Sequence, residues 1–88
     1  VISLTQSLAE GLARHKVRVN AEAPGLTETD MQSHGDPQRL AQLVAASPIP
    51  RMASPDEIAA VVEFLLSEQS SFMTGQTLVA SGGRVMLP

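Results

Sequence analysis

Residues 19–29 read Val-Asn-Ala-Glu-Ala-Pro-Gly-Leu-Thr-Glu-Thr. This stretch decides the fold, because it predicts a strand that stops at Pro24-Gly25 and opens into a hydroxyl-bearing loop. Pro24 has no N–H and therefore cannot continue a central ladder. Gly25 permits a positive φ or the close approach of another molecule. Ligands of open α/β sheets bind just outside the carboxyl ends of the strands, so we expect this loop to contact a ligand.

The strand itself is predicted from the alternation of residues 17–23. Apolar and polar residues alternate there with a period of two, which is typical of a strand. One face carries Val17, Val19, Ala21 and Ala23, and the other carries Arg18, Asn20 and Glu22. A polar second face is unusual for a strand buried on both sides. Asn20 and Glu22 should therefore have partners or lie near an edge or an interface.

Helices are predicted on both sides of this strand from apolar residues spaced three to four apart. The segments are residues 1–14, about 37–46, and 55 to 66 or 67. Asp36 is placed to cap the second helix, and Ser54 and Glu57 are placed to form a capping box at the third. No side chain ahead of Val1 can cap the first helix, so we expect the natural helix to begin upstream.

A second short strand is predicted at residues 76–80, where Gly82-Gly83 follows as a stop signal. The order helix, strand, helix, helix, strand predicts two parallel strands with crossover helices in a right-handed unit. Two strands are too few for an independent sheet. We therefore interpret the 88 residues as an α/β structure that is incomplete as a domain.

Composition excludes several functional classes. The chain has no cysteine, which excludes disulfides, thiolate metal sites and a cysteine nucleophile. The net charge is −3, and the short basic cluster at residues 14–18 has no interleaved aromatics, so a nucleic-acid partner is not expected. His15 and His34 have no second ligand at metal spacing. No apolar run reaches membrane-spanning length, and we expect a cytoplasmic protein with no membrane partner.

Three ordered blocks resemble the classical short-chain dehydrogenase/reductases. Residues 17–31 are similar to the family pattern (I/V)-R-V-N-x-(V)-x-P-G-x-x-x-T-x-M. Residues 50–59 are similar to G-R-x-x-x-P-x-E-(I/V)-A, and residues 64–83 to F-L-x-S, T-G and a closing D-G-G. Within the family, the closest resemblance is to the 3-oxoacyl-[acyl-carrier-protein] reductase-like members. Three residues depart from the patterns: Glu22, Pro50 and Ser81.

The resemblance implies a Rossmann-fold oxidoreductase that moves a hydride between NAD or NADP and a small carbonyl or alcohol substrate. Residues 1–88 would be the C-terminal part of a single NAD(P)-binding domain. The family's glycine-rich turn, catalytic Ser and Tyr-x-x-x-Lys pair are not in this sequence, which contains no Tyr. The resemblance therefore implies no catalytic residue here, and a homodimer or homotetramer as the assembly.

The resemblance also implies which residues bind the cofactor. Family members contact the nicotinamide carboxamide through the backbone after Pro-Gly, and contact the carboxamide or pyrophosphate through a threonine hydroxyl at the position of Thr29. The expected cofactor-binding residues are Pro24, Gly25, Leu26, Thr27, Thr29 and Met31. Thr29 could instead act as a helix N-cap, and the two roles are compatible. Residues of about 29–53 would form the substrate lid.

A different function is also compatible with the sequence. The chain could be a catalytically inactive, truncated module that associates through its first helix, its capped helix and its apolar tail, residues 84–88. An exposed apolar tail is a liability that burial against a partner would remove. A third and weaker alternative is a helical binding domain unrelated to the family.

Overall fold

The computed structural model describes residues 1–28 and 35–87. Its centre is a parallel pair of strands, β1 (Ala21–Pro24) and β2 (Thr77–Ala80). Ala21 lies opposite Thr77, and Pro24 lies opposite Ala80. The order helix, strand, helix, helix, strand is as predicted from the sequence.

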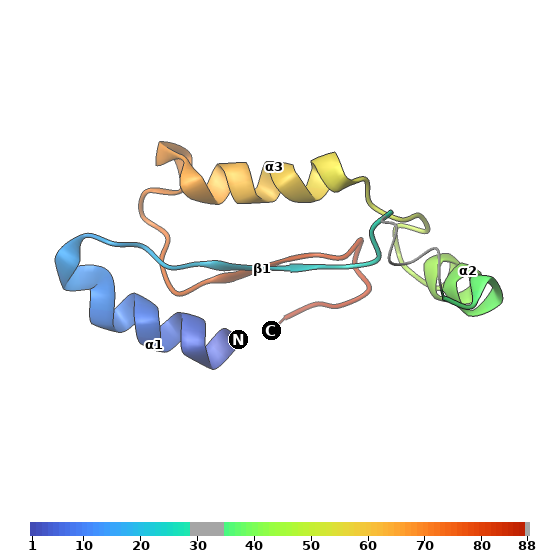
Figure 1. Ribbon diagram of the computed structural model, residues 1–88, viewed down its shortest axis with the longest axis horizontal. Coiled ribbons are helices and arrows are strands. Elements are labelled where there is room, and N and C mark those ends of the chain that lie inside the picture. Colours follow the sequence, from blue (N-terminus) through green and yellow to red (C-terminus); the bar gives the residue numbers. More distant parts are fainter. Residues whose placement is uncertain (29–34, 88) are drawn as a thin grey trace.

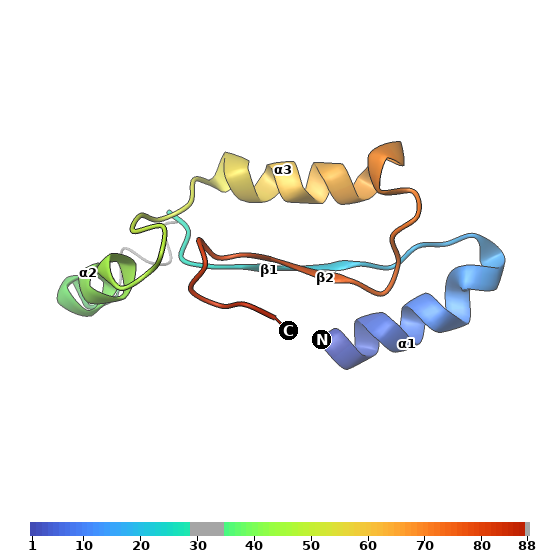
Figure 2. The same cartoon turned by 180° about the vertical axis from the view of Figure 1, so that it is seen from behind.

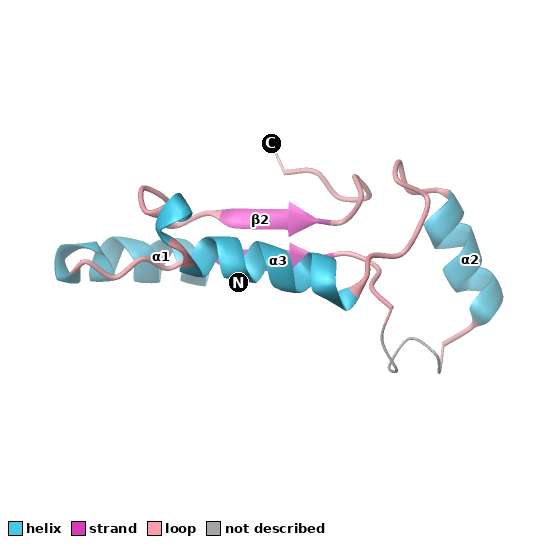
Figure 3. Cartoon of the chain, turned by 90° about the horizontal axis from the view of Figure 1, so that it is seen from above, coloured by secondary structure: helices cyan, strands magenta, loops and turns pink. Residues whose placement is uncertain are grey.

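The helices lie on both sides of this sheet and beyond one end of it. Helix α3 (Pro55–Leu66) runs along one face, and α1 (Ile2–Leu12) lies on the opposite side (Figure 1). Helix α2 (Pro37–Ala45) lies beyond the end at which both strands finish, as Figures 2 and 3 show. The first helix was predicted over residues 1–14, but its α-helical part ends at Leu12. The next turn is a 3-10 helix, η1 (Ala13–His15).

The strand β1 begins at Ala21 rather than at residue 17. The residues just before it are joined to the partner segment by one backbone bond, from Gly75 N to Val19 O at 2.8 Å, and otherwise through side chains. The Asn20 carboxamide donates to Met73 O at 3.0 Å and accepts from Gln76 N at 3.1 Å. Asn20 thus has the partners that a polar residue of this strand was expected to need.

Pro24 belongs to the ladder, contrary to the sequence prediction. Ala21 N donates to Gln76 O at 2.9 Å, and Gly25 N donates to Ala80 O at 2.9 Å. Alternate residues of a strand direct their N–H groups to opposite sides, so Pro24, the residue just before the donor Gly25, has its nitrogen facing away from β2. The missing N–H of Pro24 therefore removes no bond to β2, and the strand can include it.

Gly25 is needed for a reason that the sequence did not reveal. Its φ is not positive, whereas Gly82 and Gly83 have φ values of 65° and 87°. A Cβ added at Gly25 would lie 2.6 Å from Ser81 Cα and 2.9 Å from Ser81 Cβ. The glycine therefore allows the end of β1 to approach the residue after β2, not a left-handed turn.

Arg18 ties the start of β1 to the end of α3. Its guanidinium donates to Leu65 O at 3.1 Å, Ser70 O at 2.9 Å and Met73 O at 3.2 Å. One forked side chain thus binds three backbone carbonyls between the last turn of α3 and the segment before β2. The Glu22 carboxyl, in contrast, lacks such a partner. Its Oε1 is buried with no hydrogen-bond partner among residues 1–28 and 35–87. Burial raises the pKa of this carboxyl.

The two predicted caps are confirmed. Ser54 Oγ accepts from Glu57 N at 3.3 Å, and the Glu57 carboxylate accepts from Ser54 N at 3.0 Å, which completes the capping box of α3. Asp36 accepts from Gln38 N at 3.0 Å at the start of α2. Helix α1 begins at Ile2, and its N-cap Val1 makes no side-chain cap bond.

The apolar core is thin. Ala9 is the one apolar residue among the described residues that is fully buried. It packs close to Gly75, where an added Cβ would lie 3.4 Å from the Ala9 Cβ. Large apolar side chains remain exposed on α1, on α3, in the segment between α3 and β2, and in the last residues. Those that are more than half exposed include Leu4, Leu66, Phe72 and Met86.

Candidate cofactor-binding loop

The loop that leaves β1 lies at the end of the sheet where both strands finish (Figure 3). Gly25 N is fixed by Ala80 O, and Thr27 Oγ1 donates to Gly25 O at 3.0 Å. A threonine that bonds to a backbone carbonyl two residues earlier stabilises a local turn. The loop is therefore anchored to the sheet at one end and shaped by its own hydroxyl.

Ala53 holds the loop from the other side. Ala53 N donates to Leu26 O at 2.9 Å, and Glu28 N donates to Ala53 O at 3.0 Å. These two bonds make a single parallel bridge between Thr27 and Ala53. The segment just before α3 thus pairs with the loop at one position, in the parallel sense also found between β1 and β2.

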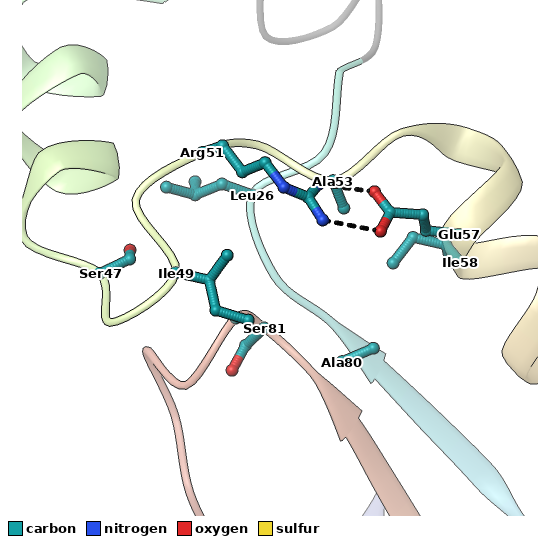
Figure 4. Close-up of a pocket in the computed structure, with 10 residues that line it drawn as sticks. Leu26, Ser47, Ile49, Arg51, Ala53, Glu57, Ile58, Ala80 and Ser81 are labelled. Carbon is teal, nitrogen blue, oxygen red and sulfur yellow. Dashed lines mark hydrogen bonds and ion pairs between the residues drawn. The ribbon is translucent and has the colours of Figure 1, made fainter.

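An ion pair lies beside this bridge. Arg51 donates from Nη1 to Glu57 Oε1 at 2.7 Å and from Nη2 to Glu57 Oε2 at 2.9 Å (Figure 4). The hydrogen bond from Arg51 and then the backbone N–H of Ser54 lower the pKa of Glu57 to about 2. Two parallel N–H···O bonds between a guanidinium and a carboxylate fix geometry as well as charge.

A cavity of about 210 Å³ opens beside the loop, between the strand ends and the start of α3. Figure 4 shows its lining, which includes Leu26, Ile49, Ala53, Ile58, Ala80 and Ser81. Ile49 N donates to Gly82 O at 2.8 Å, which holds the segment before α3 against the turn after β2. Ser81 is satisfied locally, since its Oγ accepts from Val85 N at 3.0 Å.

The loop can offer backbone donors to a ligand. Within the described part of the chain, the N–H groups of Leu26 and Thr27 have no hydrogen-bond partner. Adjacent backbone N–H groups at the carboxyl end of a sheet suit a carboxamide or a phosphate oxygen. The residues present therefore fit one side of a dinucleotide.

Among the described residues, the ionisable side chains that line the cavity are already engaged. The ionisable groups beside the cavity, Arg51 and Glu57, are paired with each other. The whole sequence has no tyrosine and no cysteine. No group of His, Asp and Glu in the described residues could hold a metal ion.

The structure places four of the six predicted site residues together. Pro24, Gly25, Leu26 and Thr27 form the loop at the strand end. The other two, Thr29 and Met31, lie outside the described residues. Sequence reasoning missed Ala53 and the ion pair at Arg51. The second family-like block contained both, but nothing in its spacing showed that it bonds to the first block.

Comparison with known proteins gives consistent matches. The family described as enoyl-(acyl carrier protein) reductase matches residues 1–84. A 3-oxoacyl-[acyl-carrier-protein] reductase from Chlamydia pneumoniae is 43% identical over 83 residues, which is 94% of this chain and 34% of that protein. Dehydrogenase/reductase SDR family member 4 from Bos taurus is 42% identical and covers 94% of this chain and 30% of that protein.

Solved structures agree with these sequence matches. A 3-oxoacyl-[acyl-carrier protein] reductase from Brucella melitensis has a TM-score of 0.92 at 41% identity, over 98% of this chain and 32% of that chain. Another such reductase from Brucella melitensis, with bound NAD, has a TM-score of 0.88 at 40% identity, over 98% of this chain and 30% of that chain. The chain thus spans about a third of the length of the relatives that it matches.

No helix in the described ranges is long and apolar enough to cross a membrane.

Proposed function

The chain belongs to the short-chain dehydrogenase/reductase family, and from this membership we propose that it forms the C-terminal part of an NAD(P)-dependent oxidoreductase. In this proposal it supplies the nicotinamide-side loop of a single Rossmann domain in a cytoplasmic enzyme. The proposal includes a small carbonyl or alcohol substrate and no nucleic-acid or membrane partner. The bound cofactor would supply the hydride chemistry, and the residues of this chain would bind and orient it.

One observation carries this proposal: the backbone N–H groups of Leu26 and Thr27, which have no partner among residues 1–28 and 35–87, lie between Gly25 and Glu28, whose own N–H groups are both hydrogen-bonded. A fixed donor geometry favours binding, because the loop loses little conformational freedom when a ligand binds to it. Pro24 and Gly25 set where the loop leaves the sheet. Thr29 and Met31 remain part of the proposed site as residues of the same loop.

We also propose that the exposed apolar surface is covered by other protein in the working enzyme. Leu4 is 61% exposed, Leu66 80% and Met86 74%. A folded protein rarely leaves this much apolar surface on several elements in water. Further segments of the domain and a second copy of the subunit are the proposed coverings, which supports a homodimer or homotetramer.

The test uses the complete polypeptide encoded by the reading frame that contains this chain. Titration with NADH and NADPH, followed by nicotinamide fluorescence, should show saturable binding of at least one dinucleotide. Reduction of a 3-oxoacyl thioester, followed by loss of reduced-nicotinamide absorbance, should accompany it. Failure to bind either dinucleotide would overturn the proposal.

The 88-residue chain alone provides a second test, because it contains no Tyr, the residue of the family's Tyr-x-x-x-Lys pair. We expect no carbonyl reduction by the chain alone. Turnover by this polypeptide would contradict the proposal that the catalytic residues lie outside these 88 residues.

The alternative of an inactive association module is supported by the same exposed side chains, including Phe72, which is fully exposed. It predicts a reading frame that encodes little more than this chain, and a purified product that self-associates without binding a dinucleotide. Light scattering together with the cofactor titration separates the two functions.

A further inference from the structure

We propose that Arg51 and Glu57 are positioning residues that hold the nicotinamide-side loop in place through Ala53. This inference rests on the proposed function for its effect on cofactor binding. Its structural basis, however, lies entirely in contacts within residues 25–57, and it can be tested without a cofactor.

Ala53 is the contact through which the loop is held. Its N–H and its C=O bond to Leu26 O at 2.9 Å and Glu28 N at 3.0 Å. Residues on both sides of Thr27 are thereby tied to one alanine. Any movement of Ala53 moves the backbone donors that would face the cofactor.

The Glu57 carboxylate fixes Ala53 from both directions along the chain. It accepts two bonds from Arg51, two residues before Ala53, at 2.7 Å and 2.9 Å. It also accepts from Ser54 N, the next residue, at 3.0 Å. Glu57 lies in the first turn of α3, so one side chain connects a regular helix to the irregular segment that precedes it.

The ion pair is exposed, so its role is positional more than energetic. The Arg51 and Glu57 side chains are 58% and 47% exposed, and exposed pairs contribute little to stability. A bidentate guanidinium–carboxylate pair nevertheless restricts the relative orientation of its two side chains. Weakening it should loosen the loop while leaving global stability almost unchanged.

Two conservative substitutions separate the pair from the helix cap. Glu57→Gln keeps a side chain that can complete a capping box, but it removes the charge. Arg51→Lys keeps the charge but removes the fork that makes two parallel bonds. Glu63→Gln is the matched control, because Glu63 is on the same helix, outside the cavity lining, and forms none of these bonds.

The experiment measures dinucleotide dissociation constants and melting temperature in the complete polypeptide. E57Q and R51K should each weaken binding up to about fivefold, the range open to an exposed pair, with little change in melting temperature. The double variant should bind no more weakly than the worse single variant, because both act on one interaction. E63Q should behave as the parent protein.

Amide hydrogen exchange provides the readout that does not need a cofactor. Exchange at the N–H groups of Ala53 and Glu28 should be faster in E57Q and R51K than in E63Q. Unchanged exchange at these two amides would overturn the positioning role, even if the parent binds a dinucleotide. Faster exchange in a protein that binds no dinucleotide would support the positioning role of Arg51 and Glu57 and refute only the proposed function. Additive losses of affinity in the double variant, or a matching loss in E63Q, would also overturn it.

Discussion

Gly25→Ala is the substitution that most directly tests how the candidate loop is built. The added Cβ would lie 2.6 Å from Ser81 Cα, 2.9 Å from Ser81 Cβ and 3.3 Å from Ser81 C. Carbon atoms in contact normally lie about 3.5–4.0 Å apart. One of the two segments must therefore shift by roughly 1 Å, which strains the bond from Gly25 N to Ala80 O.

The expected cost follows from known effects of overpacking. Extra atoms forced into a packed site cost about 1–3 kcal/mol. Replacing glycine also restricts the unfolded chain, which returns about 0.4–1 kcal/mol. We expect Gly25→Ala to lower the free energy of unfolding by about 1–2 kcal/mol and to weaken dinucleotide binding, because the loop moves with Gly25.

The assay is urea denaturation of the complete polypeptide, with cofactor titration on the same samples. Gly11→Ala is the matched control, because a Cβ at Gly11 meets nothing within 4 Å. Gly11 is inside α1, where alanine should stabilise by about 0.5–1 kcal/mol. The same chemical change should thus have opposite signs at the two sites.

A second variant at Ser81 tests the cause of the strain. Ser81→Gly removes the contact at 2.9 Å, but the contact at 2.6 Å is with Ser81 Cα and remains. The double variant should therefore recover only part of the lost stability. A Gly25→Ala protein as stable as the parent, with equal cofactor affinity, would refute this account of the glycine.

Three further predictions concern residues away from the loop. Arg18→Lys should lower the free energy of unfolding by about 1.5–3 kcal/mol, because one ammonium cannot replace the forked donors to carbonyls at the end of α3. Thermal denaturation measures this loss, and a loss of less than a few tenths of a kcal/mol would contradict the prediction. Ser54→Ala should cost about 1 kcal/mol by the same assay, and an unchanged midpoint would show that the capping box is dispensable. Burial raises the folded-state pKa of Glu22 above 4.5, so the folded state binds more protons and stability should fall as pH rises from 4.5 through the raised value. Glu22→Gln should flatten this pH dependence in urea titrations, and an identical slope in both proteins would show that Glu22 is not its source.

The thin core explains why the predictions are framed for the complete polypeptide. The described residues bury few side chains, and the sheet has only two strands. A two-stranded sheet needs further packing to be stable. In the proposed enzyme, further segments would pack on β1, α1 and α3, so stability and binding should be measured in the complete polypeptide.

Local chemistry was readable from the sequence because the interactions involved are close along the chain. The capping box at Ser54 and Glu57 and the cap at Asp36 were predicted and are present. The order of the elements and the family followed from periodicity and from the three blocks. The start of β1 was misjudged, because alternation continues through residues that are joined to the partner segment mostly by side-chain bonds and not by a regular ladder.

The sequence by itself determined which segments are helices and strands, and where a ligand loop would begin. Tertiary structure alone decided why the loop has its shape. Gly25 is required by Ser81, Pro24 is tolerated because its nitrogen faces away from β2, and Ala53 holds Leu26. These contacts join residues that are far apart in the sequence. Their spacing therefore carries no periodic signal, and only folding brings the atoms within bonding distance.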